Sequence, residues 1–259
     1  MSAIEFSDEM ARRLELTYQS RDLVAQRRET LYWLNLATGE EVLDVGSGPG
    51  FLCEDMADAV GKDGRVVGID ISEDLLGRAR QRNGRPWLSY KIAHATAIDL
   101  PDRSFDVVSC VQVAEYVSDL AAAIAEMFRL LRSGGRAIVV ATDWDSIVWH
   151  TADRTRMAAI LEVWETHCAH PRLPRTLGPA LKAGGFSLDE TKVYPILNLE
   201  WDSDTYSAGL AGLMREYVAS QDAGLEHHIE KWLAEFSELD ERGEYFFTIN
   251  RYIFCVSKQ

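Results

Sequence analysis

Three glycines at alternate positions follow an apolar run that contains one carboxylate. The run Val42–Val45 includes Asp44, and a segment of helical character begins at Phe51. Glycine lets the backbone turn sharply and lets a ligand approach closely. An open α/β sheet binds ligands at the carboxyl ends of its strands, so this turn is a candidate ligand loop. Its residues are Gly46, Ser47, Gly48, Pro49 and Gly50.

The spacing of the glycines leaves two interpretations open. The dinucleotide fingerprint is Gly-x-Gly-x-x-Gly, whereas this loop reads Gly-x-Gly-x-Gly, one residue shorter between the last two glycines. A pyrophosphate needs bare backbone amides at the start of a helix, and the altered spacing weakens that interpretation. A glycine turn that binds no ligand is the other one.

A second carboxylate lies 20 residues after the loop. Arg65–Asp70 reads as a second strand that ends in an acid, and Asp70 follows Gly50 by 20 positions. An acidic residue at this place hydrogen-bonds the ribose hydroxyls of a bound nucleotide. A helix cap or a surface charge is the alternative, but together with the loop the spacing favours an adenosine-binding role for Asp70.

The elements that must position these residues alternate between strands and helices. Apolar runs predict five strands, with helices between them that include 73–82 and 119–132. Such alternation predicts a doubly wound parallel sheet with helices on both faces. The helix over 119–132 is expected to end at Ser133-Gly134-Gly135, with glycine as the left-handed cap. The five strands are Glu41–Val45, Arg65–Asp70, Ser89–Ile92, Phe105–Cys110 and Arg136–Thr142.

The segment before the first strand is predicted to be helical over residues 6–36, with Ser20 as a cap of its second helix. It is expected to lie as a lid, residues 1–38, across the carboxyl edge of the sheet. Tyr18 is the candidate in this lid to face a bound cation through its ring. Ordinary packing of Tyr18 is the alternative.

Composition restricts the class of partner. The net charge of −14 disfavours a nucleic-acid substrate, because an acidic chain repels phosphates. The four cysteines are far apart, so neither a disulfide framework nor a zinc site is indicated, and neighbouring histidines do not predict a metal. No apolar run reaches the ~20 residues that span a bilayer, and no signal-peptide core is seen. We therefore expect a cytoplasmic protein with a small-molecule substrate and no membrane partner.

Four motifs in register resemble those of the class I S-adenosylmethionine-dependent methyltransferases. The similarity covers about residues 40–142. The motifs are Val-Leu-Asp-Val-Gly-Ser-Gly-Pro-Gly, Val-Val-Gly-Ile-Asp-Ile-Ser, Leu-Pro-Asp-Arg-Ser-Phe-Asp-Val-Val and Leu-Leu-Arg-Ser-Gly-Gly-Arg.

The resemblance implies S-adenosyl-L-methionine as the cofactor and assigns residues to it. The glycine loop with Ser47 holds the methionine part, with Asp44 near its ammonium group. Asp70 takes the ribose, and Ile71 packs on the adenine. The stretch that reads the adenine edge is His94, Ala95 and Thr96, where His94 replaces the usual aspartate. Gln112, at the end of the fourth strand, falls where the family commonly touches the cofactor.

The family's sheet ends in an antiparallel pair, and the C-terminal part supplies one. Thr176–Gly184 is predicted to be a helix, and Thr191–Leu199 and Tyr245–Val256 to be strands six and seven. The predicted fold is thus a Rossmann-like, seven-stranded mixed sheet with an antiparallel last strand. We expect one domain over 1–259, with a cofactor core at 40–142 and a C-terminal part at 143–259. The latter carries a helical insert at 200–244, where substrate choice commonly lies.

Methyl transfer needs alignment more than a fixed catalytic motif. Candidates for the acceptor site follow strands four and five. Glu115 and Asp143 are the candidate acids. His150 is the candidate base, because the imidazole group of histidine ordinarily titrates near neutral pH. A surface or capping role for His150 is the alternative. Further polar candidates are Tyr116, Asp145, Arg175, Tyr245, Asn250 and Arg251.

The predicted function is methyl transfer to oxygen or nitrogen of a small molecule. One alternative is a nicotinamide-dependent oxidoreductase, from which the glycine spacing differs. The other is a cofactor-binding interaction module on the same fold, because a fold does not fix a function.

Overall fold

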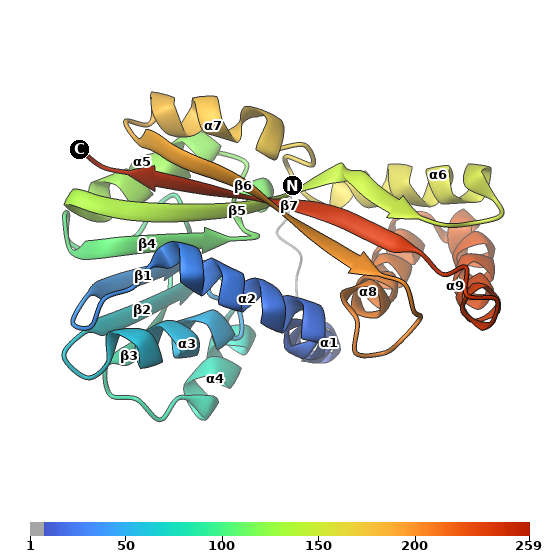
Figure 1. The fold of residues 1–259 in the computed structure, drawn as a ribbon, viewed down its shortest axis with the longest axis horizontal. Helices are drawn as coiled ribbons and strands as arrows, with labels where there is room; N and C mark the ends of the chain where they lie inside the picture. The colour runs from blue at the N-terminus through green and yellow to red at the C-terminus, as the bar shows by residue number, and fades with distance from the viewer. Residues whose placement is uncertain (1–7) are drawn as a thin grey trace.

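The computed structural model describes residues 8–259 and shows a seven-stranded sheet of order β3-β2-β1-β4-β5-β7-β6 (Figure 1). Strands β1 to β5 are parallel, and β7 runs antiparallel to both of its neighbours, β5 and β6. The predicted fold class is therefore confirmed. The strands are β1 Glu41–Val45, β2 Arg65–Asp70, β3 Leu88–Ile92, β4 Phe105–Val111, β5 Leu131–Trp149, β6 Ser187–Asn198 and β7 Phe247–Ser257.

Helices cover both faces of the sheet, as the alternation predicts. Apolar side chains of α2, α3 and α4 pack with Val42 and Val107 on one face. Those of α5 and α7 pack with Leu43 and Val108 on the other face. The helices are α1 Asp8–Gln19, α2 Arg21–Leu34, α3 Phe51–Val60, α4 Glu73–Arg82, α5 Leu120–Leu130, α6 Arg154–Trp164, α7 Pro174–Ala183, α8 Tyr206–Gln221 and α9 Glu226–Glu241.

Strands β5, β6 and β7 extend beyond β1 to β4 (Figure 1). A second cluster of buried apolar side chains packs on this extension. The prediction that strand five ends at Thr142 is wrong, because β5 continues to Trp149 with an irregular register between Asp143 and Val148. Trp149 is buried against Trp232 and Phe236 of α9. The sequence of β5 does not reveal this cover, since α9 lies about 80 residues further along the chain.

The start of β5 also differs from the prediction. The helix expected over 119–132 ends at Leu130, because Leu131 is already extended and pairs with Phe105 of β4. Gly134 has φ +78° but is not the helix cap; its N–H donates to the carbonyl of Lys258 at the end of β7. The predicted boundaries of α7, β6 and β7 differ from the observed ones by one to four residues.

The N-terminal helices break at Ser20, which has extended backbone angles. Ser20 is not the side-chain cap that was predicted, because its buried hydroxyl has no hydrogen-bond partner. Helix α1 lies between α4 and α8: Glu15 pairs with Arg82 of α4, and Thr17 lies against Gly209 of α8. Residues 1–7 of the predicted lid lie outside the described residues.

All four cysteines are free, and Cys53, Cys110 and Cys168 are buried. Within residues 8–259, no helix is long and apolar enough to cross a membrane.

Candidate functional site

The loop between β1 and α3 depends on glycine at each of its three positions. Gly46, Gly48 and Gly50 have φ values of +74°, +53° and +82°, a region that side chains with a Cβ rarely adopt. A Cβ on Gly46 would overlap the side chain of Val113, and one on Gly50 would overlap Tyr90. A Cβ on Gly48 would meet no atom within 4 Å, so there is space beside this buried position.

Asp70 joins the end of β2 to this loop. Its Oδ2 accepts a hydrogen bond from the N–H of Gly48 at 2.8 Å, and its Oδ1 accepts one from the N–H of Ser72 at 2.9 Å. Burial raises the pKa of Asp70, and these backbone donors oppose that rise. Ile71 beside it is an exposed apolar side chain, with 48% of its surface accessible. An acid and an apolar surface therefore adjoin the loop, as an adenosine site requires.

Asp44 lies behind the loop and is almost fully buried. Its carboxylate accepts hydrogen bonds from the hydroxyl of Ser109 at 2.7 Å and from the thiol of Cys53 at 3.2 Å. Burial raises its pKa to about 6. Asp44 therefore links β1 to β4 through Ser109 and to α3 through Cys53.

The segment after β3 folds into a tight turn. The Nδ1 atom of His94 lies 2.7 Å from the hydroxyl of Thr96, and it also accepts the N–H of Thr96 at 3.3 Å. Ala95 is buried beneath the turn. The imidazole of His94 remains exposed, and only its Nδ1 is engaged by Thr96.

Gln112 has a strained backbone at the end of β4. Its φ of +58° is uncommon for a residue with a Cβ, and such strain is found disproportionately at ligand sites. Its N–H donates to the carbonyl of Val140 at 2.8 Å, and its Oε1 accepts the hydroxyl of Thr142 at 2.6 Å. Gln112 thus ties the ends of β4 and β5 together at the carboxyl edge.

Glu115 is fully buried in the short 3-10 turn Ala114–Tyr116. Its Oε1 accepts the N–H of Thr142 at 3.3 Å, while its Oε2 has no hydrogen-bond partner. Burial raises the pKa of Glu115 to about 7. A carboxyl group that titrates near neutral pH with one free oxygen can accept a proton from a bound molecule.

Aromatic and basic side chains surround Glu115. Burial raises the pKa of Tyr18 of α1 to about 12. The negative charges of nearby Asp70 and Glu115 add to this rise, whereas the positive charge of Arg251 opposes it. The guanidinium carbon of Arg251 lies 4.6 Å from the centre of the Tyr206 ring. Tyr18 therefore lies close enough to Asp70 and to Glu115 for the charges of both to raise its pKa.

We call this group, Tyr18, Glu115, Tyr206 and Arg251, the chamber residues. Sequence reasoning missed Tyr206, and it also missed Gln26, which is not one of the chamber residues but accepts a hydrogen bond from Arg251. No local signal identifies them, because they lie on α8 and α2 in patterns that are typical of any packed helix.

Two of the acceptor-site candidates lie elsewhere. Asp143 is on the opposite face of β5 from Thr142, where both of its oxygens accept from Arg175 at 3.0 and 3.1 Å. Asp145 also accepts from Arg175, at 2.8 Å. The carboxylate of Asp143, a predicted acceptor-site candidate, is thus already paired with an arginine of α7.

His150 is also not placed where a base would need to be. It is exposed and lies opposite Phe246 of the neighbouring strand, whereas Thr142 lies opposite Arg251, so the two are about 17 Å apart along the strand pair. Its backbone N–H donates to the carbonyl of Phe246 at the outer end of the strand pair. The unexpected length of β5 therefore carries His150 away from the carboxyl edge of the parallel strands.

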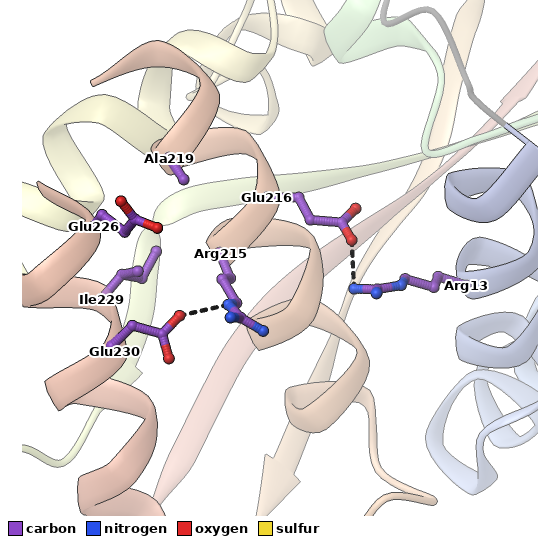
Figure 2. A pocket seen from close by; sticks show the side chains of 7 residues that line it. All are labelled: Arg13, Arg215, Glu216, Ala219, Glu226, Ile229 and Glu230. Carbon is purple, nitrogen blue, oxygen red and sulfur yellow. Dashed lines mark ion pairs between the residues drawn. The ribbon is translucent and has the colours of Figure 1, made fainter. Parts of the chain in front are cut away.

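A surface pocket lies between α1, α8 and α9 (Figure 2). Ion pairs of Arg13 with Glu216 and of Arg215 with Glu230 cross it. None of its lining residues belongs to the glycine loop or the chamber. Its lining is Arg13, Arg215, Glu216, Ala219, Glu226, Ile229 and Glu230.

Comparisons with known proteins agree on one family. Residues 43–139 match the model of a methyltransferase domain. The 2-phytyl-1,4-naphtoquinone methyltransferase of Thermosynechococcus vestitus is 32% identical over 64% of this chain and 79% of its own length. The demethylmenaquinone methyltransferase of Oceanobacillus iheyensis is 30% identical over 47% of this chain and 52% of its own length.

Among solved structures, the phosphoethanolamine N-methyltransferase 2 of Haemonchus contortus, in complex with S-adenosyl-L-methionine, has the same fold. Its TM-score is 0.63 at 16% identity, over 98% of this chain and 58% of that one. The chain spans 52% to 63% of the length of several curated relatives that it matches.

Proposed function

The chain belongs to the class I S-adenosylmethionine-dependent methyltransferases, and from this premise we propose that it methylates oxygen or nitrogen of a small molecule. The family removes the nicotinamide-dependent oxidoreductase from consideration, as the glycine spacing also does. Membership of this enzyme family also argues against the non-catalytic interaction module. The acceptor and the atom that is methylated belong to the proposal.

The residues present fit the cofactor that the family uses. The space beside Gly48 is open, Asp70 adjoins the loop, and Ile71 offers an exposed apolar face. S-Adenosyl-L-methionine, when bound, supplies a methyl group activated by a positive sulfur. We propose that the ring of Tyr18 faces that charge and that the carboxylate of Asp70 binds the ribose. The remaining proposed contacts are Asp44, Gly46, Ser47, Gly50, His94, Ala95, Thr96 and Gln112.

The observation that carries the acceptor proposal is the buried carboxyl of Glu115 with its free Oε2. Leaving a buried polar atom without a partner costs about 1–3 kcal/mol, so a bound molecule with a donor at this point restores the lost hydrogen bond. Glu115 would hold that donor and take its proton, because its pKa lies near 7. Tyr18 and Tyr206 would exclude water from the same chamber.

We propose that residues 1–259 form one domain and that helix α1 acts as a lid over its cofactor and acceptor sites. It contacts α4 on the cofactor side through Glu15 and Arg82, and α8 on the acceptor side through Thr17 and Gly209. Such a bridge can admit both molecules when it moves and exclude water when it is in place. The net charge of −14 and the small-molecule substrates in the names of the relatives support an acceptor other than nucleic acid.

The test is calorimetry with S-adenosylhomocysteine, followed by transfer of labelled methyl groups to a panel of small phenols, enols and amines. We expect saturable binding of one equivalent and labelled product from members of the panel. Binding without transfer to any small acceptor, combined with transfer to RNA or protein, would contradict the proposed acceptor class.

A further inference from the structure

Arg251 is a buried cation at the carboxyl edge of the sheet. It lies opposite Thr142 in the antiparallel pairing of β5 and β7, so the two side chains are on the same face. Only 4% of its surface is exposed. The backbone N–H of Thr142 also donates a hydrogen bond to Glu115. Arg251 and Glu115 therefore have Thr142 as a common neighbour.

The partners of Arg251 leave its charge without a close counterion. One terminal nitrogen donates to the amide oxygen of Gln26, and the guanidinium lies over the ring of Tyr206. Its Nε has no hydrogen-bond partner. Among the ion pairs within residues 8–259, with nitrogen and oxygen at most 4.0 Å apart, none includes Arg251.

Glu115 is the carboxyl group that faces Arg251 at longer range, and the positive charge of Arg251 opposes the rise in its pKa. The two groups do not satisfy each other, because Nε of Arg251 and Oε2 of Glu115 both remain unpartnered. Burying a cation and an acid that each have one hydrogen-bonding atom without a partner lowers the stability of the folded chain. A ligand that supplies an anion to one and a proton to the other would satisfy both.

We propose that Arg251 binds an oxyanion of the acceptor, so that the acceptor is an enol or a phenol and not an amine. This inference rests on the proposed function, in which the acceptor enters beside Glu115. The O–H bond of the acceptor breaks, its proton passes to Oε2 of Glu115, and the electron pair stays on the oxygen next to the guanidinium. An ammonium group would be repelled by Arg251, since like charges interact strongly where water is excluded.

The rings of the chamber agree with this acceptor class. Tyr18 and Tyr206 flank the two charged groups, and aromatic side chains pack well on the flat body of a phenol or an enol. The competing interpretation is that Arg251 only balances the charge of Glu115. In that case the chamber would not distinguish an ionisable hydroxyl from its methyl ether.

The experiment compares three probes of similar shape with the protein saturated with S-adenosylhomocysteine. 4-Nitrophenol has an acidic hydroxyl whose ionisation changes its visible spectrum, 4-nitroanisole has none, and 4-nitrobenzylamine is a cation. We expect 4-nitrophenol to bind at least ten-fold tighter than the other two, with the spectrum of the phenolate in the bound state. Equal affinities, tighter binding of the amine, a neutral spectrum, or no binding of any probe would overturn the proposal.

Variants separate the anion site from general packing. Arg251→Gln is expected to weaken binding of 4-nitrophenol at least ten-fold and to abolish the phenolate spectrum, while Arg251→Lys retains part of both. Arg156→Gln is the matched control, because Arg156 is another largely buried arginine, paired with Glu235 away from the chamber. Since the comparison of the three probes uses the unaltered chain, the proposal can fail even if Arg251→Gln does not fold.

The outcome also distinguishes this inference from the proposed function. Methyl transfer to amines together with tight binding of S-adenosylhomocysteine would leave the proposed function intact and refute the role of Arg251. Failure of S-adenosylhomocysteine to bind would instead refute the cofactor assignments.

Discussion

The carboxylate of Asp70 accepts a hydrogen bond from the backbone N–H of Gly48 at 2.8 Å. The acid at the end of β2 thus holds the loop after β1 in its turn, in addition to the ribose contact that we propose. Because Asp70 has both roles, its substitution should affect cofactor binding strongly.

Asp70→Ala is expected to weaken S-adenosylhomocysteine binding by about 1.5–3 kcal/mol, because hydrogen bonds to a charged group are lost. Isothermal titration calorimetry measures the change. Asp63→Ala is the control, because Asp63 is exposed in the turn before β2, at the other end of the strand. Unchanged affinity in Asp70→Ala would remove the ribose assignment.

Glu115→Gln keeps the size of the side chain and removes its titration. If Glu115 is the base, the kcat of the unaltered enzyme rises as pH increases through about 7. In Glu115→Gln, kcat should be lower by ~10²-fold or more and should no longer rise in this pH range. Profiles of kcat against pH measure both, and cofactor affinity should not change.

His150→Ala serves as the comparison for the catalytic base. Because His150 is exposed at the outer end of β5, its removal should leave kcat and the pH profile as they are. A loss of the rise near pH 7 in His150→Ala, but not in Glu115→Gln, would reverse the assignment.

The same carboxyl group makes stability depend on pH. Burial raises the pKa of Glu115 from 4.5 to about 7, so the folded chain binds this proton more tightly than the unfolded chain does. The stabilisation is complete below pH ~4.5 and is lost as pH rises through about 7, by about 3 kcal/mol at most. Urea unfolding from pH 4.5 to 8 should therefore show a smaller decline in Glu115→Gln. Parallel declines in the two proteins would show that Glu115 is not protonated in the folded chain.

Gly209→Ala tests how α1 docks. A Cβ at this position would overlap the side chain of Thr17, which is stiff because it is β-branched. We expect α1 to loosen by about 1–3 kcal/mol, with faster limited proteolysis of α1 and weaker S-adenosylhomocysteine binding.

Gly212→Ala is the matched control on the same helix, because a Cβ there would have open space. Replacing Thr17 by alanine in the Gly209→Ala chain should restore docking in part. If Gly209→Ala and Gly212→Ala behave alike, α1 is not held by this contact.

The sequence by itself determined the cofactor half of the molecule. Short apolar runs predicted β1 to β4 along the chain and their parallel arrangement. Asp70 lies beside the loop because both follow parallel strands. These relations are local or fixed by topology, since the carboxyl ends of neighbouring parallel strands meet at one edge.

Only the tertiary structure decided which side chains lie near Glu115. Residues 143–149 continue β5 because α6 and α9 cover them, and this carries His150 away while Asp143 meets Arg175 on the other face. Arg251 and Glu115 are 136 positions apart, and the charge of Arg251 reaches Glu115 only because β7 inserts antiparallel beside β5. A local pattern encodes backbone conformation and burial, but the neighbours of a buried charge depend on how distant elements pack against one another.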